Sequence, residues 1–398
     1  MRQRFDAVIA SLDLGNCSST CATTYSYTHS RTADTCTLSP APHRDDSHSR
    51  GVWYYPVPQS IWLMMSTMQY PGDDARRQDS SATRWPHAST SAQLIRAFWV
   101  AAGIAVVLLS GPTALAGSSR DCGLLRAKYG QSSELRARIA GVPAILHIPN
   151  VIRKPPIILW HGFGPPASKE ALADALPLDD VPAVKVYLDL PLFGERLPSG
   201  GVNELVRRQT EDFASLIFAP SVVGAASELS AVVSELQRVG CMFASDKVGV
   251  FGFSAGGTAA FIALIQRRIP IGVAVTVNAS TGLQASVEAY ERAAKRNYSW
   301  TPAARAIAED TNAIAHARQM ARGTPPPALL LIHGKDDLTL NPGRTVALYG
   351  ALLPYYREAG DTNRLDLVMA TKMNHAWTTA AIASQLRISI AEWFNRYL

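Results

Sequence analysis

The sequence predicts an α/β fold in which a mostly parallel central sheet is covered by helices on both faces. Short apolar runs alternate with segments of helical periodicity along most of the chain beyond residue 154. Runs such as 156–160 are apolar throughout, which is typical of strands that are buried on both faces. Because strands joined by helical crossovers lie parallel, one doubly covered sheet is expected. Two short strands around Ala140 and Gly141 predict an antiparallel start to it.

The expected elements follow from these patterns. The strands are predicted at 135–139, 142–148, 156–160, 183–188, 247–251, 271–277, 328–332 and 365–369. The helices are predicted at 204–239 with an interruption near Pro220, and at 255–267, 341–355 and 376–397. One connection, about 279–326, is long and has helical character at 283–296 and 302–322. Insertions of this length at one end of a sheet are usually functional, so we expect a helical lid there.

Residues 1–93 differ in composition from the rest of the chain. They contain neither lysine nor glutamate, which first occur at Lys128 and Glu134, and they show no helical or strand period. Two interpretations are open, a disordered natural extension and translated upstream sequence from a start codon placed too early. We favour the second because of the segment that follows.

Residues 94–116 have the form of a secretory signal peptide. Arg96 precedes an apolar core, and Ala114-Leu115-Ala116 provides a small-residue cleavage site. We therefore expect export to the periplasm or the extracellular space, a folded domain at 117–398, and no stable membrane insertion after cleavage. A single N-terminal membrane anchor is the alternative, although the apolar core is shorter than the ~20 residues that a span needs.

Past the signal segment the sequence contains two cysteines, Cys122 and Cys241. An even pair in an exported chain permits one disulfide. Two unrelated buried thiols are the other interpretation.

The charge pattern gives no sign of a nucleic-acid partner. The net charge of +6 is spread along the chain without a lysine or arginine cluster or interleaved aromatic residues. His333, Asp336 and Asp337 lack a plausible set of further ligands, so no metal is expected. No other cofactor is indicated.

The motif Gly252-Phe253-Ser254-Ala255-Gly256 lies between an expected strand and an expected helix. The Gly-x-Ser-x-Gly pattern requires this context, because a nucleophile on a tight strand-to-helix turn has a strained backbone and needs small neighbours. The turn also places the hydroxyl near a helix N-terminus, where negative charge is favoured. Ser254 is therefore the expected nucleophile.

A serine hydroxyl needs a base to activate it, and in this order of elements the base follows the acid. His375 lies after the last expected strand and before the last expected helix, and we expect it to be the base. The acid should follow the preceding strand, where the chain has His333-Gly334-Lys335-Asp336-Asp337. The arrangement His-Gly-x-x-Asp selects Asp337, whereas Asp336 is expected to be solvated or to cap a turn. His333 is interpreted as structural.

The oxyanion of acyl transfer needs hydrogen-bond donors. A glycine-lined loop, His161-Gly162-Phe163-Gly164, follows the expected strand at 156–160. We expect one donor to be the backbone N–H of Phe163 and the other to be the N–H of Ala255. His161 is expected to brace the loop.

In this order the motifs resemble those of the α/β-hydrolase superfamily over 135–398. The run Phe251-Gly-Phe-Ser-Ala-Gly-Gly257 is similar to secreted bacterial esterases of the dienelactone-hydrolase-like and prolyl-oligopeptidase-like group. A dienelactone hydrolase would have cysteine at position 254, and a full prolyl oligopeptidase would carry a propeller domain for which the sequence leaves no room. The resemblance implies the α/β-hydrolase fold and an acyl-enzyme mechanism, and it does not imply the substrate.

We therefore expect a secreted, carboxylesterase-like serine hydrolase whose partner is a small-molecule ester. A small exopeptidase or amidase and an acyltransferase with the same triad are the alternatives, and a non-catalytic binding member of the fold is a remote one. An exopeptidase would anchor a peptide amino terminus with a carboxylate, for which Glu195, Glu291 and Glu309 are candidates. The lid, with aromatic residues in the segment Tyr290 to Trp300, is expected to cover the acyl pocket, so that Tyr298 and Trp300 should affect the acyl preference. The alternative is that its helices only pack on the edge of the sheet.

Overall fold

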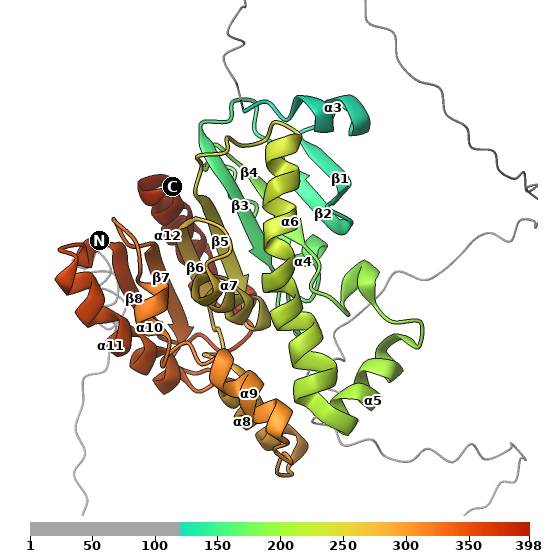
Figure 1. Ribbon diagram of the computed structural model, residues 1–398, viewed down its shortest axis with the longest axis vertical. Helices are drawn as coiled ribbons and strands as arrows, with labels where there is room; N and C mark the ends of the chain where they lie inside the picture. The colour runs from blue at the N-terminus through green and yellow to red at the C-terminus, as the bar shows by residue number, and fades with distance from the viewer. Residues whose placement is uncertain (1–119) are drawn as a thin grey trace, which may run out of the picture. The chain divides into compact units, whose positions relative to one another are not determined.

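The computed structural model describes residues 120–398, which form one eight-stranded sheet with helices on both faces (Figure 1). The extension predicted at 1–93 and the signal peptide predicted at 94–116 lie outside the described residues. The predicted α/β fold is confirmed by this architecture.

The strand order in the sheet is β1-β2-β4-β3-β5-β6-β7-β8. β2 pairs antiparallel with β1 and with β4, and the other neighbours are parallel, as the sequence predicted. The strands are β1 (Glu134–Ile139), β2 (Val142–His147), β3 (Lys154–Trp160), β4 (Ala183–Leu188), β5 (Val248–Phe253), β6 (Ile271–Val277), β7 (Ala328–Gly334) and β8 (Leu365–Ala370).

Helices cover both faces of the sheet. The helices are α3 (Gly123–Tyr129), α4 (Lys169–Ala175), α5 (Gly201–Phe213), the π-helical η2 (Ala214–Val223), α6 (Gly224–Arg238), α7 (Ala255–Gln266), α8 (Leu283–Ala294), α9 (Pro302–Asp310), α10 (Ala317–Met320), α11 (Pro342–Glu358) and α12 (Ala383–Tyr397). Three short 3₁₀ turns are η1 (Gly194–Arg196), η3 (Thr362–Arg364) and η4 (Trp377–Thr379). α6, α7, α10 and α11 belong to one face, and α4 and α12 pack on the other (Figure 1).

The sheet separates two apolar layers, which explains why its central strands are apolar throughout. Successive side chains of a strand point to opposite faces. Ile158 and Val250 belong to the layer under α6 and α7, whereas Ile157 and Phe251 belong to the layer under α12. No position in the middle of these strands faces water, so no polar alternation is visible in the sequence.

The long helical region between β4 and β5 breaks at Asp212, and the interruption predicted near Pro220 is wrong. Asp212 has non-helical backbone angles, φ −157° and ψ 99°. Its carboxylate accepts hydrogen bonds from the N–H of Ser215 at 3.1 Å and from the hydroxyl of Tyr298 at 2.5 Å. Pro220 lies inside η2, and the chain continues from there into α6.

This region is long and apolar enough to cross a membrane by length and composition alone. Half of its apolar window is buried inside the domain, where η2 and α6 pack against α7. A helix that is buried in the core of a domain can have the same length and apolar composition.

Two further helix boundaries differ from the prediction. The expected helix at 302–322 is divided into α9 and α10, and the expected closing helix at 376–397 begins as the short turn η4 before α12 starts at Ala383. Turn residues 313–316 separate α9 from α10, and residues 380–382 form a bend and turn between η4 and α12.

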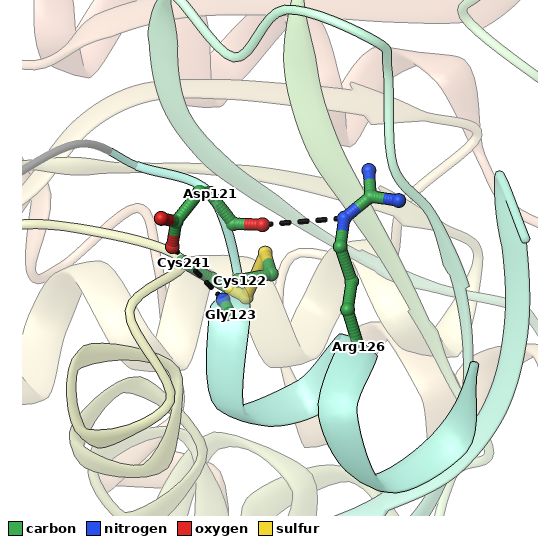
Figure 2. Close-up of a disulfide and its surroundings, with 5 residues drawn as sticks. All are labelled: Asp121, Cys122, Gly123, Arg126 and Cys241. Carbon is green, nitrogen blue, oxygen red and sulfur yellow. Dashed lines mark hydrogen bonds between the residues drawn. A yellow bond between two sulfur atoms is a disulfide. The ribbon is translucent and has the colours of Figure 1, made fainter. Parts of the chain in front are cut away.

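Cys122 and Cys241 form a disulfide (Figure 2). It joins the start of α3 to the turn after α6, over a sequence separation of 119 residues. The backbone N–H groups of Asp121 and Cys122 both donate to the carbonyl of Gly240, at 3.2 and 3.1 Å. Of the two interpretations open for these cysteines, the structure has the disulfide.

Candidate active site

The expected site residues come together at the carboxyl ends of the parallel strands. Ser254 follows β5, Asp337 follows β7 and His375 follows β8. Because parallel strands end at the same edge of a sheet, the loops after them converge there, which is where open α/β sheets bind ligands.

Ser254 lies on the strained turn that its motif predicts. Its backbone angles are φ 52° and ψ −116°, and such a positive φ is unusual for a residue other than glycine. A Cβ added at Gly252 would lie 2.2 Å from the carbonyl oxygen of Gly256, and one added at Gly256 would lie 2.5 Å from that of His161. The two glycines are therefore required by the close approach of the strand, the helix and the loop after β3.

The three side chains of the predicted triad form a continuous hydrogen-bonded relay. The Nε2 atom of His375 is 3.1 Å from Ser254 Oγ, and its Nδ1 atom is 2.8 Å from Asp337 Oδ2. The other carboxylate oxygen of Asp337, Oδ1, accepts the backbone N–H groups of Thr339 and Leu340 at 2.8 and 2.9 Å. This order of contacts fixes the histidine with an unprotonated Nε2 facing the hydroxyl, as a general base requires.

The environment keeps Asp337 ionised. Burial of this carboxyl alone would raise its pKa, but hydrogen bonds from His333 and His375 hold the pKa well below its usual range. Asp336 is exposed at the edge of the site, and its backbone N–H donates to the carbonyl of Met373 at 3.1 Å. The choice of Asp337 over Asp336 thus agrees with the contacts of His375.

The loop after β3 lies across the nucleophile. Phe163 and Ala255 line the same cavity as Ser254, and within the described part of the chain neither backbone N–H has a hydrogen-bond acceptor. The fully buried ring of His161 spans the loop, because Nδ1–H donates to the carbonyl of Gly162 at 2.7 Å and Nε2 accepts the N–H of Leu190 at 3.2 Å. Two free donors on a braced loop and on a helix start can hold an oxyanion.

A cluster of charged side chains that the sequence did not predict lies next to His161 of this loop. The ammonium of Lys169, which is 1% exposed, lies 2.7 Å from Asp189 Oδ2 and 2.8 Å from Glu195 Oε1. Burial alone would lower the pKa of Lys169, but the bonds to these carboxylates raise it well above its usual value. Asp189 Oδ1 lies 3.7 Å from Nε2 of His161, whose own pKa is lowered by burial. The sequence around Lys169 does not indicate that its side chain is buried with these carboxylates.

Asn278 is a second residue that sequence reasoning missed. It follows β6 in a left-handed conformation, φ 47°, and is fully buried. Its Nδ2 donates to the carbonyls of Asn374 and His375 at 3.0 and 2.9 Å, and its Oδ1 accepts the N–H of Gly334 at 2.8 Å. One side chain therefore ties the loop of the base to the turn of the acid.

A cavity of about 320 Å³ opens onto Ser254 and His375. Two stacked aromatic pairs contribute to its wall, Phe163 with Phe193 at 4.8 Å between ring centroids and Phe213 with Tyr290 at 5.3 Å. Tyr290 comes from α8 in the predicted lid, but Phe213 belongs to the α5–η2 region between β4 and β5. The wall is thus shared between two insertions, of which the sequence predicted one.

Of the aromatic residues in the lid segment 290–300, Tyr290 lines the cavity, whereas Tyr298 and Trp300 do not. The ring of Tyr298 lies edge-on to Tyr290 at 6.4 Å, and Trp300 lies edge-on to Tyr298 at 5.2 Å. Tyr298 packs against Tyr290 of the cavity wall, and Trp300 packs against Tyr298.

The carboxylates considered as peptide anchors also lie outside the cavity lining. Glu195 pairs with Lys169, and Glu291 Oε1 accepts the N–H of Tyr298 at 2.8 Å. Glu309 does not line the cavity, whereas the exposed residue Asp336 does. Within residues 120–398, no group of three or more histidine, cysteine or acidic side chains is placed to hold a metal ion.

The doubly covered sheet and the residues at the ends of its strands define an α/β-hydrolase fold with the triad of a serine hydrolase. Residues 222–398 match the model of the prolyl oligopeptidase family. No curated protein sequence matches the chain. The resemblance to the α/β-hydrolase superfamily is confirmed by the match to this family together with the fold.

Solved structures of low sequence identity are similar to this chain, and the first of them has a similar fold. TT1662 from Thermus thermophilus is 20% identical with a TM-score of 0.50, over 66% of this chain and 97% of that chain. A puromycin-hydrolyzing peptidase of Mycobacterium tuberculosis is 15% identical with a TM-score of 0.47, over 67% of this chain and 40% of that chain. A dienelactone hydrolase of Anabaena variabilis is 19% identical with a TM-score of 0.41, over 67% of this chain and 98% of that chain.

Proposed function

We propose that this serine hydrolase is an esterase that cleaves carboxylic esters with a compact apolar or aromatic acyl group. The observation that carries the proposal is the relay from Asp337 through His375 to Ser254, which opens directly onto the aromatic-walled cavity. A volume of about 320 Å³ suits a small ring or a short chain better than a long lipid tail.

In the first half of the reaction, His375 Nε2 takes the hydroxyl proton while Ser254 Oγ bonds to the ester carbonyl carbon. The carbonyl electron pair moves to its oxygen, and the N–H groups of Phe163 and Ala255 stabilise the resulting oxyanion. When this intermediate collapses, the ester C–O bond breaks and the alcohol leaves with the proton from His375. Asp337 stays ionised and holds the imidazolium in place.

In the second half, water attacks the acyl-enzyme. His375 removes a proton from the water, the oxyanion forms again, and its collapse breaks the bond to Ser254 Oγ, which recovers the proton. The carboxylic acid is released and the enzyme returns to its starting state.

A small peptidase or amidase is the second candidate, and the match of residues 222–398 to the prolyl oligopeptidase family favours it. The lining of the cavity favours the esterase. Glu195, Glu291 and Glu309 do not line it, and the acidic residue that does, Asp336, is exposed. A peptide amino terminus would need a carboxylate that is fixed within the site.

The test compares p-nitrophenyl esters of increasing acyl length with dipeptide anilides, on the wild type and on two serine variants. Ser254→Ala should lower kcat for the preferred ester by about 10⁴-fold or more, since the nucleophile is lost. Ser286→Ala, which removes another hydroxyl from the cavity wall, is the matched control and should stay within about fivefold. Residual turnover of Ser254→Ala near the wild-type rate would overturn the triad, and faster cleavage of the anilides would favour the peptidase.

We also propose that the protein is exported. The predicted signal peptide at 94–116 and the disulfide between Cys122 and Cys241 support this, because disulfides persist in oxidising compartments. A chain that begins at Met68, shortly before the predicted signal peptide, would be expressed in a bacterial host and fractionated, and its N-terminus and thiol content would be determined by mass spectrometry. A new N-terminus at Gly117 and blocked cysteines are expected in the exported fraction. Retention of 94–116 in the membrane fraction would indicate the anchor.

A further inference from the structure

His333 lies against the acid of the triad, although the proposed reaction does not use it. It is the second-to-last residue of β7, four residues before Asp337, and its side chain is 1% exposed. The Nε2 atom of His333 is 3.2 Å from Asp337 Oδ2, the same oxygen that faces Nδ1 of His375 at 2.8 Å. One carboxylate oxygen is thus held between two imidazole rings.

The contacts of His333 determine which nitrogen carries its proton. Nε2 faces two oxygens that can only accept, those of Asp337 and of the Leu340 carbonyl at 3.3 Å. The proton therefore lies on Nε2, and Nδ1 accepts the hydroxyl of Thr345, 2.7 Å away in α11. With both nitrogens engaged, His333 has no lone pair free to act as a base.

These contacts surround the carboxylate of Asp337. Oδ1 accepts the backbone N–H groups of Thr339 and Leu340, whereas Oδ2 accepts the Nδ1–H of His375 and lies 3.2 Å from Nε2 of His333, whose N–H it shares with the Leu340 carbonyl. Without His333, Oδ2 would keep one partner, the Nδ1–H of His375. The carboxylate would then be held by the protein through Oδ1 alone, and Oδ2 could shift with the imidazole ring.

We propose that His333 is a positioning residue of the triad, which fixes Asp337 Oδ2 on the Nδ1–H of His375 and thereby sets the orientation of the base. His333 does not line the cavity, so it acts through Asp337 and does not contact the substrate. The inference rests on the proposed hydrolase function of Ser254.

The experiment compares His333→Leu with His333→Gln on the preferred p-nitrophenyl ester. Leucine fills the space without a donor, whereas the side-chain amide of glutamine can donate to the same carboxylate oxygen. His333→Leu should lower kcat on the order of 10- to 100-fold with KM within about threefold, as expected for a lost hydrogen bond to a charged group. His333→Gln should recover most of this loss. Circular dichroism at the assay temperature must show both variants folded.

Two measurements separate positioning from a structural role. The downfield proton resonance of the bond between His375 and Asp337 should be broadened or shifted in His333→Leu and restored in His333→Gln. In the wild type, the imidazole ¹⁵N shifts of His333 should report a proton on Nε2 and none on Nδ1, a result that needs no variant to fold.

The inference is overturned if His333→Leu turns over within twofold of the wild type, if both variants lose kcat only in proportion to their unfolded fraction, or if the proton is found on Nδ1. Labelling of wild-type Ser254 by a fluorophosphonate separates this failure from that of the proposed function. Labelled Ser254 with an active His333→Leu would refute only the positioning role. Wild-type protein that is neither labelled nor active would refute the hydrolase itself.

Discussion

Replacing Asn278 should damage both the stability and the activity of the enzyme. Asn278→Gly removes three buried hydrogen bonds, those to the carbonyls of Asn374 and His375 and from the N–H of Gly334. At about 1 kcal/mol for each net bond, the free energy of unfolding should fall by about 3 kcal/mol. Because the loop of His375 loses two anchors, kcat should fall by roughly tenfold or more, even where the protein remains folded.

A second substitution at the same position isolates the backbone conformation. Asn278 has φ 47°, which glycine adopts without strain and alanine does not. Asn278→Ala should therefore be less stable than Asn278→Gly by about 1 kcal/mol.

The assay is urea unfolding followed by fluorescence, beside steady-state kinetics at a temperature at which each variant is folded. Asn363→Gly, an exposed asparagine in η3, is the control and should change the free energy of unfolding by less than about 1 kcal/mol. The reasoning would be refuted if Asn278→Gly kept the wild-type kcat and lost no more stability than this control.

Three further predictions concern the acid, the cavity and the disulfide. Asp337→Asn should lower kcat by about 10³-fold or more, whereas Asp336→Asn should stay within about tenfold; equal losses in the ester assay would contradict the assignment. Tyr290→Ala should shift the preference in a p-nitrophenyl ester series toward longer acyl groups, because it removes part of the wall, while Trp300→Ala should lower the melting temperature without that shift. Cys122→Ser opens a loop with a sequence separation of 119 and should lower the free energy of unfolding by about 4 to 5 kcal/mol with kcat preserved. If the free energy of unfolding measured in urea fell by less than about 1 kcal/mol, the stabilisation expected from closing this loop would be refuted.

The order of the elements and the residues of the triad could be predicted from the sequence because their signals are local. A strand that is buried on both faces is apolar at every position, and β4 and β6 have the predicted bounds for this reason. The turn around Ser254 must exclude side chains at Gly252 and Gly256, so the nucleophile has a signature within five residues. Order along the chain then selects His375 and Asp337.

The break in the helical region after β4 shows where local signals fail. Proline predicts an interruption at Pro220, but the chain passes through it in a π-helical segment. The actual break is at Asp212, whose carboxylate binds the hydroxyl of Tyr298, 86 residues away in the sequence. A partner at that separation overrides the local preference, and nothing near Asp212 indicates it.

The same reason explains which parts of the site the sequence left out. Asn278 contacts residues 56, 96 and 97 positions away, and Lys169 is buried with an aspartate 20 positions away. His333 could be seen in its motif, but the three groups that surround its ring and fix its proton, on Asp337, Leu340 and Thr345, could not. By itself the sequence determined the fold class and the three residues of the relay, because backbone sterics and burial leave patterns within a few residues. The tertiary structure alone decided the cavity wall and the groups that orient the relay, because those contacts depend on which distant segments the folded sheet brings side by side.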